Sequence, residues 1–94
     1  KKYKIVKKYI DSGYDLNIQN HNGCTPLIYA ALNNKIEIVK LLLSAGANIN
    51  KQDNYGYTAL IWATRYNNIE IAKLLLNASA DIDKQDNDGN TALI

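Results

Sequence analysis

The sequence reads GCTPLI at residues 23–28, GYTALI at residues 56–61 and GNTALI at residues 89–94. Each phrase begins 33 residues after the one before it, so the chain is an internal repeat. A unit of this length is too short to bury an apolar face alone, and copies become stable only when they stack with a core between neighbours. The period therefore predicts a solenoid.

Each unit contains two segments with a helical pattern. Thr25 and Thr58 are suited to cap the start of a first helix, and Pro26 fits its first position because proline has no N–H to leave unpaired. The stretches IEIVKLLL at residues 36–43 and IEIAKLLL at residues 69–76 predict a second helix that is apolar on most sides. The sequence thus predicts an all-α fold of helix-turn-helix units.

Polar and small residues separate the predicted helices. Asn34 and Asn67 are placed to turn the chain in the left-handed conformation, which their short side chains tolerate. Gly46 suits the end of the second helix, and residues 48–50 alternate like one arm of a short hairpin. Ser79 stands one unit after Gly46, so a positive φ there would cost about 1 kcal/mol. We therefore expect short β-hairpin loops between the helical pairs and local strain at Ser79.

The repeat divides the chain into units of one domain. We expect a single domain over residues 1–94, made of a partial repeat (1–20), two full repeats (21–53 and 54–86) and the start of a truncated repeat (87–94). Because the pattern is interrupted at both ends, we expect the chain to be a piece of a longer array.

The composition excludes several classes of protein. Eleven basic and nine acidic residues give a net charge of +2, which indicates no strong preference for polyanions. The apolar runs are too short to span a bilayer, so this segment is not expected to insert into a membrane. Cys24 is the single cysteine, which excludes an internal disulfide and favours an intracellular, cytoplasmic location.

The 33-residue period, the Gly-x-Thr-Pro-Leu opening, the Ile-Val-Lys-Leu-Leu-Leu helix and the Gly-Ala-Asn-Ile-Asn loop together resemble the ankyrin repeat over essentially the whole chain. The resemblance implies a module that binds another protein through a concave surface of hairpin tips and first helices. The family usually has His after Thr-Pro-Leu, whereas this chain has Ile28, Ile61 and Ile94, so the polar tie between loops is expected to be missing. Trp62 is expected to fill volume between repeats and to need a partner for its indole N–H if buried.

The resemblance also places partner-binding positions on the hairpin tips and on the first helices. Tyrosine and arginine are frequent among the residues that dominate binding energy, and three tyrosines and the only arginine fall in one unit. The alternative is that the tyrosine rings pack within the scaffold. The predicted partner-binding residues are His21, Asn22, Leu32, Asn33, Asn54, Tyr55, Tyr57, Arg65, Tyr66, Asp88 and Asn90, and the remaining hairpin-tip positions are Cys24, Gln52, Gln85 and Asn87.

Other kinds of site find little support. His21 and Cys24 have a spacing that could hold a metal, but a zinc site needs four ligands, or three and a water, and the other ligands are absent. The sequence also lacks a nucleophile, a base and an orienting group together, so no catalytic residue, cofactor, metal or small-molecule substrate is predicted. The acidic run within residues 81–88 lacks the loop of an EF-hand and is interpreted as solvated turn residues.

Five lysines fall within residues 1–8, which could indicate nucleic acid or an acidic lipid surface. Ile5, Val6, Tyr9 and Ile10 interleave with them at helical spacing, which is typical of an outer helix with a lysine-rich solvated face. No aromatic platform or groove-reading motif accompanies the charges, so nucleic acid is not expected as a partner. The predicted function is non-catalytic protein–protein interaction, and the alternative is an architectural spacer within a larger multidomain protein.

Overall fold

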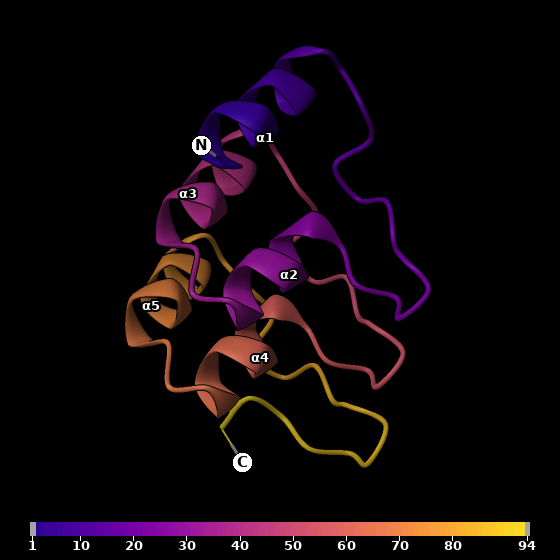
Figure 1. Cartoon of the computed structure of the whole chain (residues 1–94). Helices are drawn as coiled ribbons and strands as arrows, with labels where there is room; N and C mark the ends of the chain where they lie inside the picture. Colours follow the sequence, from indigo (N-terminus) through magenta and orange to yellow (C-terminus); the bar gives the residue numbers. More distant parts are fainter. Residues whose placement is uncertain (1, 94) are drawn as a thin grey trace.

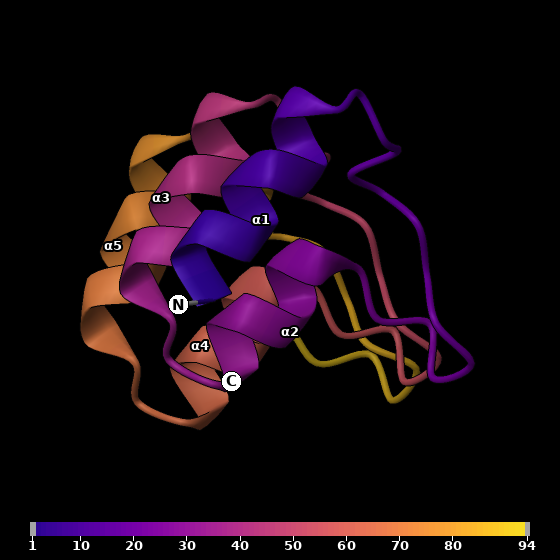
Figure 2. The same ribbon diagram turned by 45° about the horizontal axis from the view of Figure 1, so that its top comes forward.

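The computed structural model describes residues 2–93, which contain five α-helices and no strand. The helices are α1 (Lys2–Asp11), α2 (Pro26–Leu32), α3 (Ile36–Ser44), α4 (Ala59–Arg65) and α5 (Ile69–Asn77) (Figure 1). The outer helices α1, α3 and α5 lie side by side in one layer, and α2 packs on α4 in a second layer (Figure 2). The structure is therefore the all-α solenoid that the period predicts. Ile94, the last residue of the third repeated phrase, lies outside the described residues.

The first helices begin where the capping residues predict. Thr25 and Thr58 have extended backbones, and their hydroxyl oxygens accept hydrogen bonds of 3.2 Å from the amides of Ile28 and Ile61. Pro26 is the first residue of α2. Each cap satisfies an amide that the helix leaves unpaired at its start.

The turns also confirm the sequence prediction. Asn34 and Asn67 have φ values of 57° and 58° and turn the chain between the two helices of each pair. Ser79 adopts a φ of 70°, where Gly46 of the preceding unit has 86°. A non-glycine residue in this conformation is strained by about 1 kcal/mol, so the end of α5 carries a local strain that the end of α3 does not.

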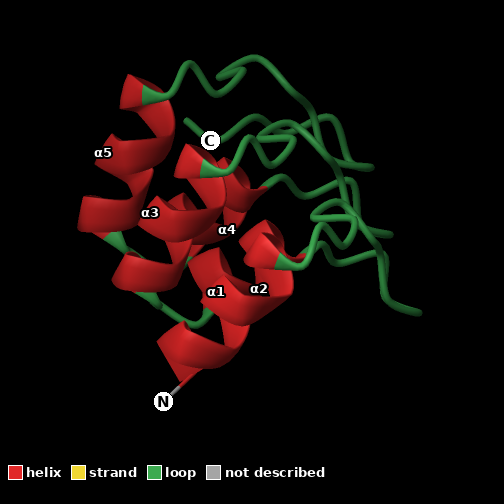
Figure 3. Ribbon diagram, turned by 90° about the horizontal axis from the view of Figure 1, so that it is seen from above, coloured by secondary structure: helices red, strands yellow, loops and turns green. Residues whose placement is uncertain are grey.

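The expectation of β-hairpin loops is only partly correct. The loops reverse direction as hairpins do, with the Asp53 amide donating to the Tyr57 carbonyl at 2.9 Å and the Gly56 amide donating to the Asp53 carbonyl at 2.9 Å. The amides of Tyr55 and Tyr57 instead donate to Asp53 Oδ1, each at 2.9 Å. Because a side chain takes these donors, no ladder of backbone bonds forms and the described loops contain no strand (Figure 3).

The core lies between the two helical layers and continues from one unit to the next. Leu42 and Leu75 of the outer helices are fully buried, and Leu41 and Leu74 are half-buried beside them. Small buried alanines on α2 and α4 let these two helices approach closely. The units thus share one apolar seam, as the repeat requires.

Candidate binding surface

The loop tips and the first helices share one side of the molecule. The loops leave the helical layers on the side of α2 and α4 and lie next to one another along the stack (Figures 2 and 3). The predicted partner-binding positions all belong to these loops and to the ends of α2 and α4.

Four aromatic rings form a continuous row on this side. Ring centroids are 5.8 Å apart from Tyr55 to Tyr57, 4.8 Å from Tyr57 to Trp62 and 5.5 Å from Trp62 to Tyr66. The guanidinium of Arg65 lies over the Tyr57 ring, 4.8 Å from its centroid. We call Tyr55, Tyr57, Trp62 and Tyr66 the aromatic row. The two ends of the row are 62% and 56% exposed, so this cluster presents ring surface to solvent.

A buried carboxylate, that of Asp53, fixes the aromatic row through hydrogen bonds. Asp53 is 8% exposed, and its Oδ1 accepts from the amides of Tyr55 and Tyr57. Its Oδ2 accepts a 2.7 Å hydrogen bond from Trp62 Nε1, which is the partner that the indole was expected to need. Asp53 is not among the residues predicted from the sequence. The signal that could have found it is an Asn or Asp three residues before the glycine in every unit, at positions 20, 53 and 86.

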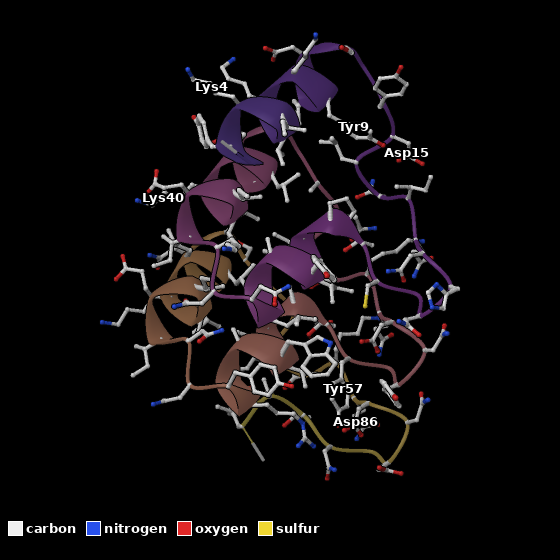
Figure 4. The ribbon with its side chains drawn as sticks, in the orientation of Figure 1. Lys4, Tyr9, Asp15, Lys40, Tyr57 and Asp86 are labelled. Carbon is white, nitrogen blue, oxygen red and sulfur yellow. The ribbon has the colours of Figure 1, made fainter. Side chains whose placement is uncertain are left out.

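The equivalent carboxylate of the last loop is buried as well. The side chain of Asp86 is 1% exposed, and its Oδ2 lies 3.9 Å from Arg65 Nη2. The hydrogen bond from the Asn90 amide lowers the pKa of the Asp86 carboxyl, so this group is charged at neutral pH. The interpretation of the whole acidic run as solvated is therefore wrong for Asp86. Figure 4 places Tyr57 and Asp86 on the same side of the molecule, where Arg65 contacts both.

Two loop asparagines, Asn54 from the predicted partner-binding set and Asn87 from the other hairpin-tip positions, connect neighbouring loops. Asn54 Nδ2 donates to the His21 carbonyl at 3.0 Å, and the Asn54 amide donates to the Asn22 carbonyl at 3.1 Å. One unit later, Asn87 Nδ2 donates to the Asn54 carbonyl at 2.8 Å and the Asn87 amide to the Tyr55 carbonyl at 2.9 Å. The side chain of Asn54 therefore ties neighbouring loops together, and His21 and Asn22 take part through their backbone carbonyls. We call these hydrogen bonds between neighbouring loops the loop ladder.

The imidazole tie between loops that the family usually has is missing from the described residues, as the sequence predicts. Ile28 and Ile61, which stand where the family usually has His, are buried in the core. The loops are joined instead by amide side chains, including Gln19 Nε2 to the Gln52 carbonyl at 3.0 Å and Gln52 Nε2 to the Gln85 carbonyl at 2.8 Å. Amide side chains can replace an imidazole here because they donate to two carbonyls at once: Gln52 also donates to Gly56 at 2.8 Å.

The remaining predicted residues do not join the aromatic row. Leu32 is half-buried against the core, and Asn33 Nδ2 donates to the Tyr29 carbonyl at 2.9 Å at the end of α2. Asp88 is exposed at its loop tip, and Asn90 is half-buried and pairs through its backbone with Asp86. The structure thus brings together Tyr55, Tyr57, Arg65 and Tyr66 from the predicted set and adds Trp62 to them.

Cys24 lies in a hollow of about 460 Å³ at the other end of the stack, with Ile18, Asn20 and Tyr29 in its lining. Burial raises the pKa of the Cys24 thiol, so the reactive thiolate is disfavoured at neutral pH. Within residues 2–93, no group of three or more His, Cys, Asp or Glu side chains is arranged to hold a metal ion.

Comparison with known proteins places this architecture in a family. The family model for ankyrin repeats, in three copies, matches residues 1–88 of the 94-residue chain. The chain belongs to the ankyrin-repeat family. Ankyrin repeats are in general protein–protein interaction modules and are typically not enzymes. No curated protein matches this ankyrin-repeat chain. None of the helices described for it is long and apolar enough to cross a membrane.

Proposed function

We propose that this ankyrin-repeat chain is a non-catalytic binding module and that its protein partner contacts the aromatic row and Arg65. The observation that carries the proposal is the unbroken series of ring contacts from Tyr55 to Tyr66, with both ends more than half exposed. Clustered Tyr, Trp and Arg side chains are the residues most often found at the energetic centre of an interface.

The row is also held in a fixed shape before any partner arrives. The indole of Trp62 is fixed by its hydrogen bond to Asp53, and the ring of Tyr57 lies between Trp62 and the Arg65 guanidinium. Side chains that are already ordered lose little conformational entropy on binding. This arrangement favours a contact surface over tyrosines that merely fill the scaffold, because the exposed ends of the row fill no internal space.

The proposal includes an intracellular, cytoplasmic location, which the single cysteine supports. The alternative function is an architectural spacer within a larger protein. A spacer requires the stacked core and the loop ladder but gives no reason for an exposed aromatic row, so substitutions in the row distinguish the two functions.

A displayed library of random peptides tests the proposal without knowledge of the natural partner. The wild-type chain should enrich a set of peptides, and Tyr55→Ser combined with Tyr66→Ser should lose that enrichment because the exposed ring surface is removed. The matched control combines Glu70→Ala and Lys73→Ala, two exposed positions on the outer helix α5, and should enrich the same peptides as the wild type. Circular dichroism verifies that all three proteins are folded. Equal enrichment by all three would refute the proposed surface, and no enrichment by any of them would favour the spacer.

A further inference from the structure

We propose that the aromatic row is a subsite for a cationic side chain, Lys or Arg, carried by a basic segment of the partner protein, and that the cation lies against the Trp62–Tyr66 pair. This inference rests on the proposed function and specifies the chemistry of the partner.

The charges around the row do not balance. The carboxylates of Asp53, Asp86 and Asp88 lie on the two loops beside the row, and Arg65 is the one cation in contact with a ring of the row or with one of these carboxylates in the described structure. The ion pairs within residues 2–93 join Lys7 to Asp11, Lys40 to Glu37 and Arg65 to Asp86. No cationic side chain therefore lies within 4 Å of the Asp53 carboxylate, although Lys51 precedes it by two residues. The buried Asp53 carboxylate is thus stabilised by three hydrogen bonds and by no cation, and its negative charge favours a cation nearby.

The hydrogen bond between Asp53 and Trp62 places this negative charge at the edge of the indole ring. The carboxylate oxygen lies 2.7 Å from Nε1, a short distance for a charge-assisted hydrogen bond. A negative charge at the N–H edge makes the face of the indole more favourable for a cation, and Trp already has the most favourable face among the aromatic side chains. The Trp62 ring is half-buried and Tyr66 is more than half exposed, so the pair remains accessible from solvent.

The protein already contains one example of the same arrangement. The Arg65 guanidinium lies against the Tyr57 ring at 4.8 Å and faces the buried Asp86 carboxylate at 3.9 Å. This surface therefore already accommodates one cation between an aromatic ring and a buried carboxylate. Trp62, in the same unit as Tyr57, and Asp53, one unit before Asp86, are a second ring and buried carboxylate beside this site. They are joined directly by a hydrogen bond, and no cationic side chain of the described residues lies within 4 Å of the Asp53 carboxylate.

An acidic partner is disfavoured by the same charges. Its carboxylates would approach Asp53, Asp86 and Asp88, and the charge of Arg65 is already partly balanced by the Asp86 carboxylate. The basic segment is thus the occupant that the local electrostatics select.

Trp62 is the only tryptophan, so its fluorescence reports directly on the row. Three peptides of one Gly-Ser framework, carrying three arginines, three citrullines or three glutamates, are titrated into the whole chain. The arginine peptide should change the Trp62 emission in a saturable manner and bind more tightly than the citrulline peptide, whereas the glutamate peptide should bind most weakly. Tyr66→Leu should weaken binding of the arginine peptide by about two- to fivefold, and Tyr66→Phe, which keeps the ring face, should retain it.

The preceding unit supplies the matched control. Tyr29 occupies the position of Trp62 and is exposed, but neutral Asn20 stands there in place of Asp53. Tyr29→Leu should therefore leave binding of the arginine peptide unchanged. Glutamate-peptide binding equal to that of the arginine peptide, or an unchanged affinity in Tyr66→Leu, would overturn the inference. If displayed peptides depend on Tyr66 but are acidic or neutral, the inference fails while the proposed function stands; if none depends on Tyr66, both fail.

Discussion

Replacement of Gly56 by alanine tests whether the loops are stacked as described. Gly56 and Gly89 are equivalent positions with φ values of +81° and +84°. A Cβ at Gly56 would lie 2.8 Å from the Asn87 amide nitrogen and 2.9 Å from the Asp86 Cα, which are both backbone atoms. A Cβ at Gly89 would meet nothing within 4 Å. The two substitutions therefore share the backbone strain and differ only in the contact with the next loop.

The expected losses of stability follow from the backbone strain at positive φ and from the contact with the next loop. An alanine at positive φ costs about 1 to 2 kcal/mol, which is the whole effect expected of Gly89→Ala. Gly56→Ala also forces an atom inside the contact distance of roughly 3.5 Å, and such overpacking adds about 1 to 3 kcal/mol. The displaced Asn87 amide would also weaken its 2.9 Å hydrogen bond to the Tyr55 carbonyl. We expect the free energy of unfolding to fall by about 2 to 5 kcal/mol in Gly56→Ala.

Urea denaturation followed by circular dichroism at 222 nm measures both losses under the same conditions. Gly23→Ala provides a second case, because its Cβ would lie 2.8 Å from the Asn54 amide nitrogen, and it should behave like Gly56→Ala. Equal losses in Gly56→Ala and Gly89→Ala would show that the loops do not pack on one another as described.

Two further predictions concern the core and the buried carboxylate. Leu75→Ala should lower the free energy of unfolding by about 2 to 5 kcal/mol because Leu75 is fully buried. Leu76→Ala, at an exposed position of the same helix, should lower it by less than about 1 kcal/mol. Similar losses of the two variants in urea denaturation would contradict the assigned core face of α5. Asp86 should stabilise the fold above its unfolded pKa of 3.8 and lose this contribution as the pH falls through its lower folded pKa, because the Asn90 amide favours the charged carboxylate. Between pH 5 and about pH 2.5, urea midpoints of Asp86→Asn should therefore fall less than those of the wild type, and parallel curves would contradict the prediction.

The local conformation of the chain could be predicted from its sequence because each signal involves neighbouring residues. The hydroxyls of Thr25 and Thr58 cap the helices, and Asn34 and Asn67 adopt the left-handed turns. The strained Ser79 was also predictable, because the period aligns it with Gly46 and its conformation follows from that alignment.

The candidate binding surface could be predicted only in part because the contacts of its residues depend on how the repeats stack. The Asn54 side chain bonds to a carbonyl 33 residues away, and only the orientation of neighbouring loops decides whether such a side chain faces a partner or a loop. The link between Asp53 and Trp62 depends on how the loop meets α4. The absence of strands in the described loops has a similar cause, since Asp53 competes with the backbone for the amides of Tyr55 and Tyr57.

Nuclear magnetic resonance titration of the isotopically labelled chain with the arginine peptide tests the central claim most directly. We predict that the largest shift changes fall on the Trp62 indole N–H and on the side chains of Tyr55, Arg65 and Tyr66, with little change along the outer helices α3 and α5. Changes centred on α3 and α5, or spread evenly over the chain, would contradict the claim that this ankyrin-repeat protein recognises its partner through the aromatic row.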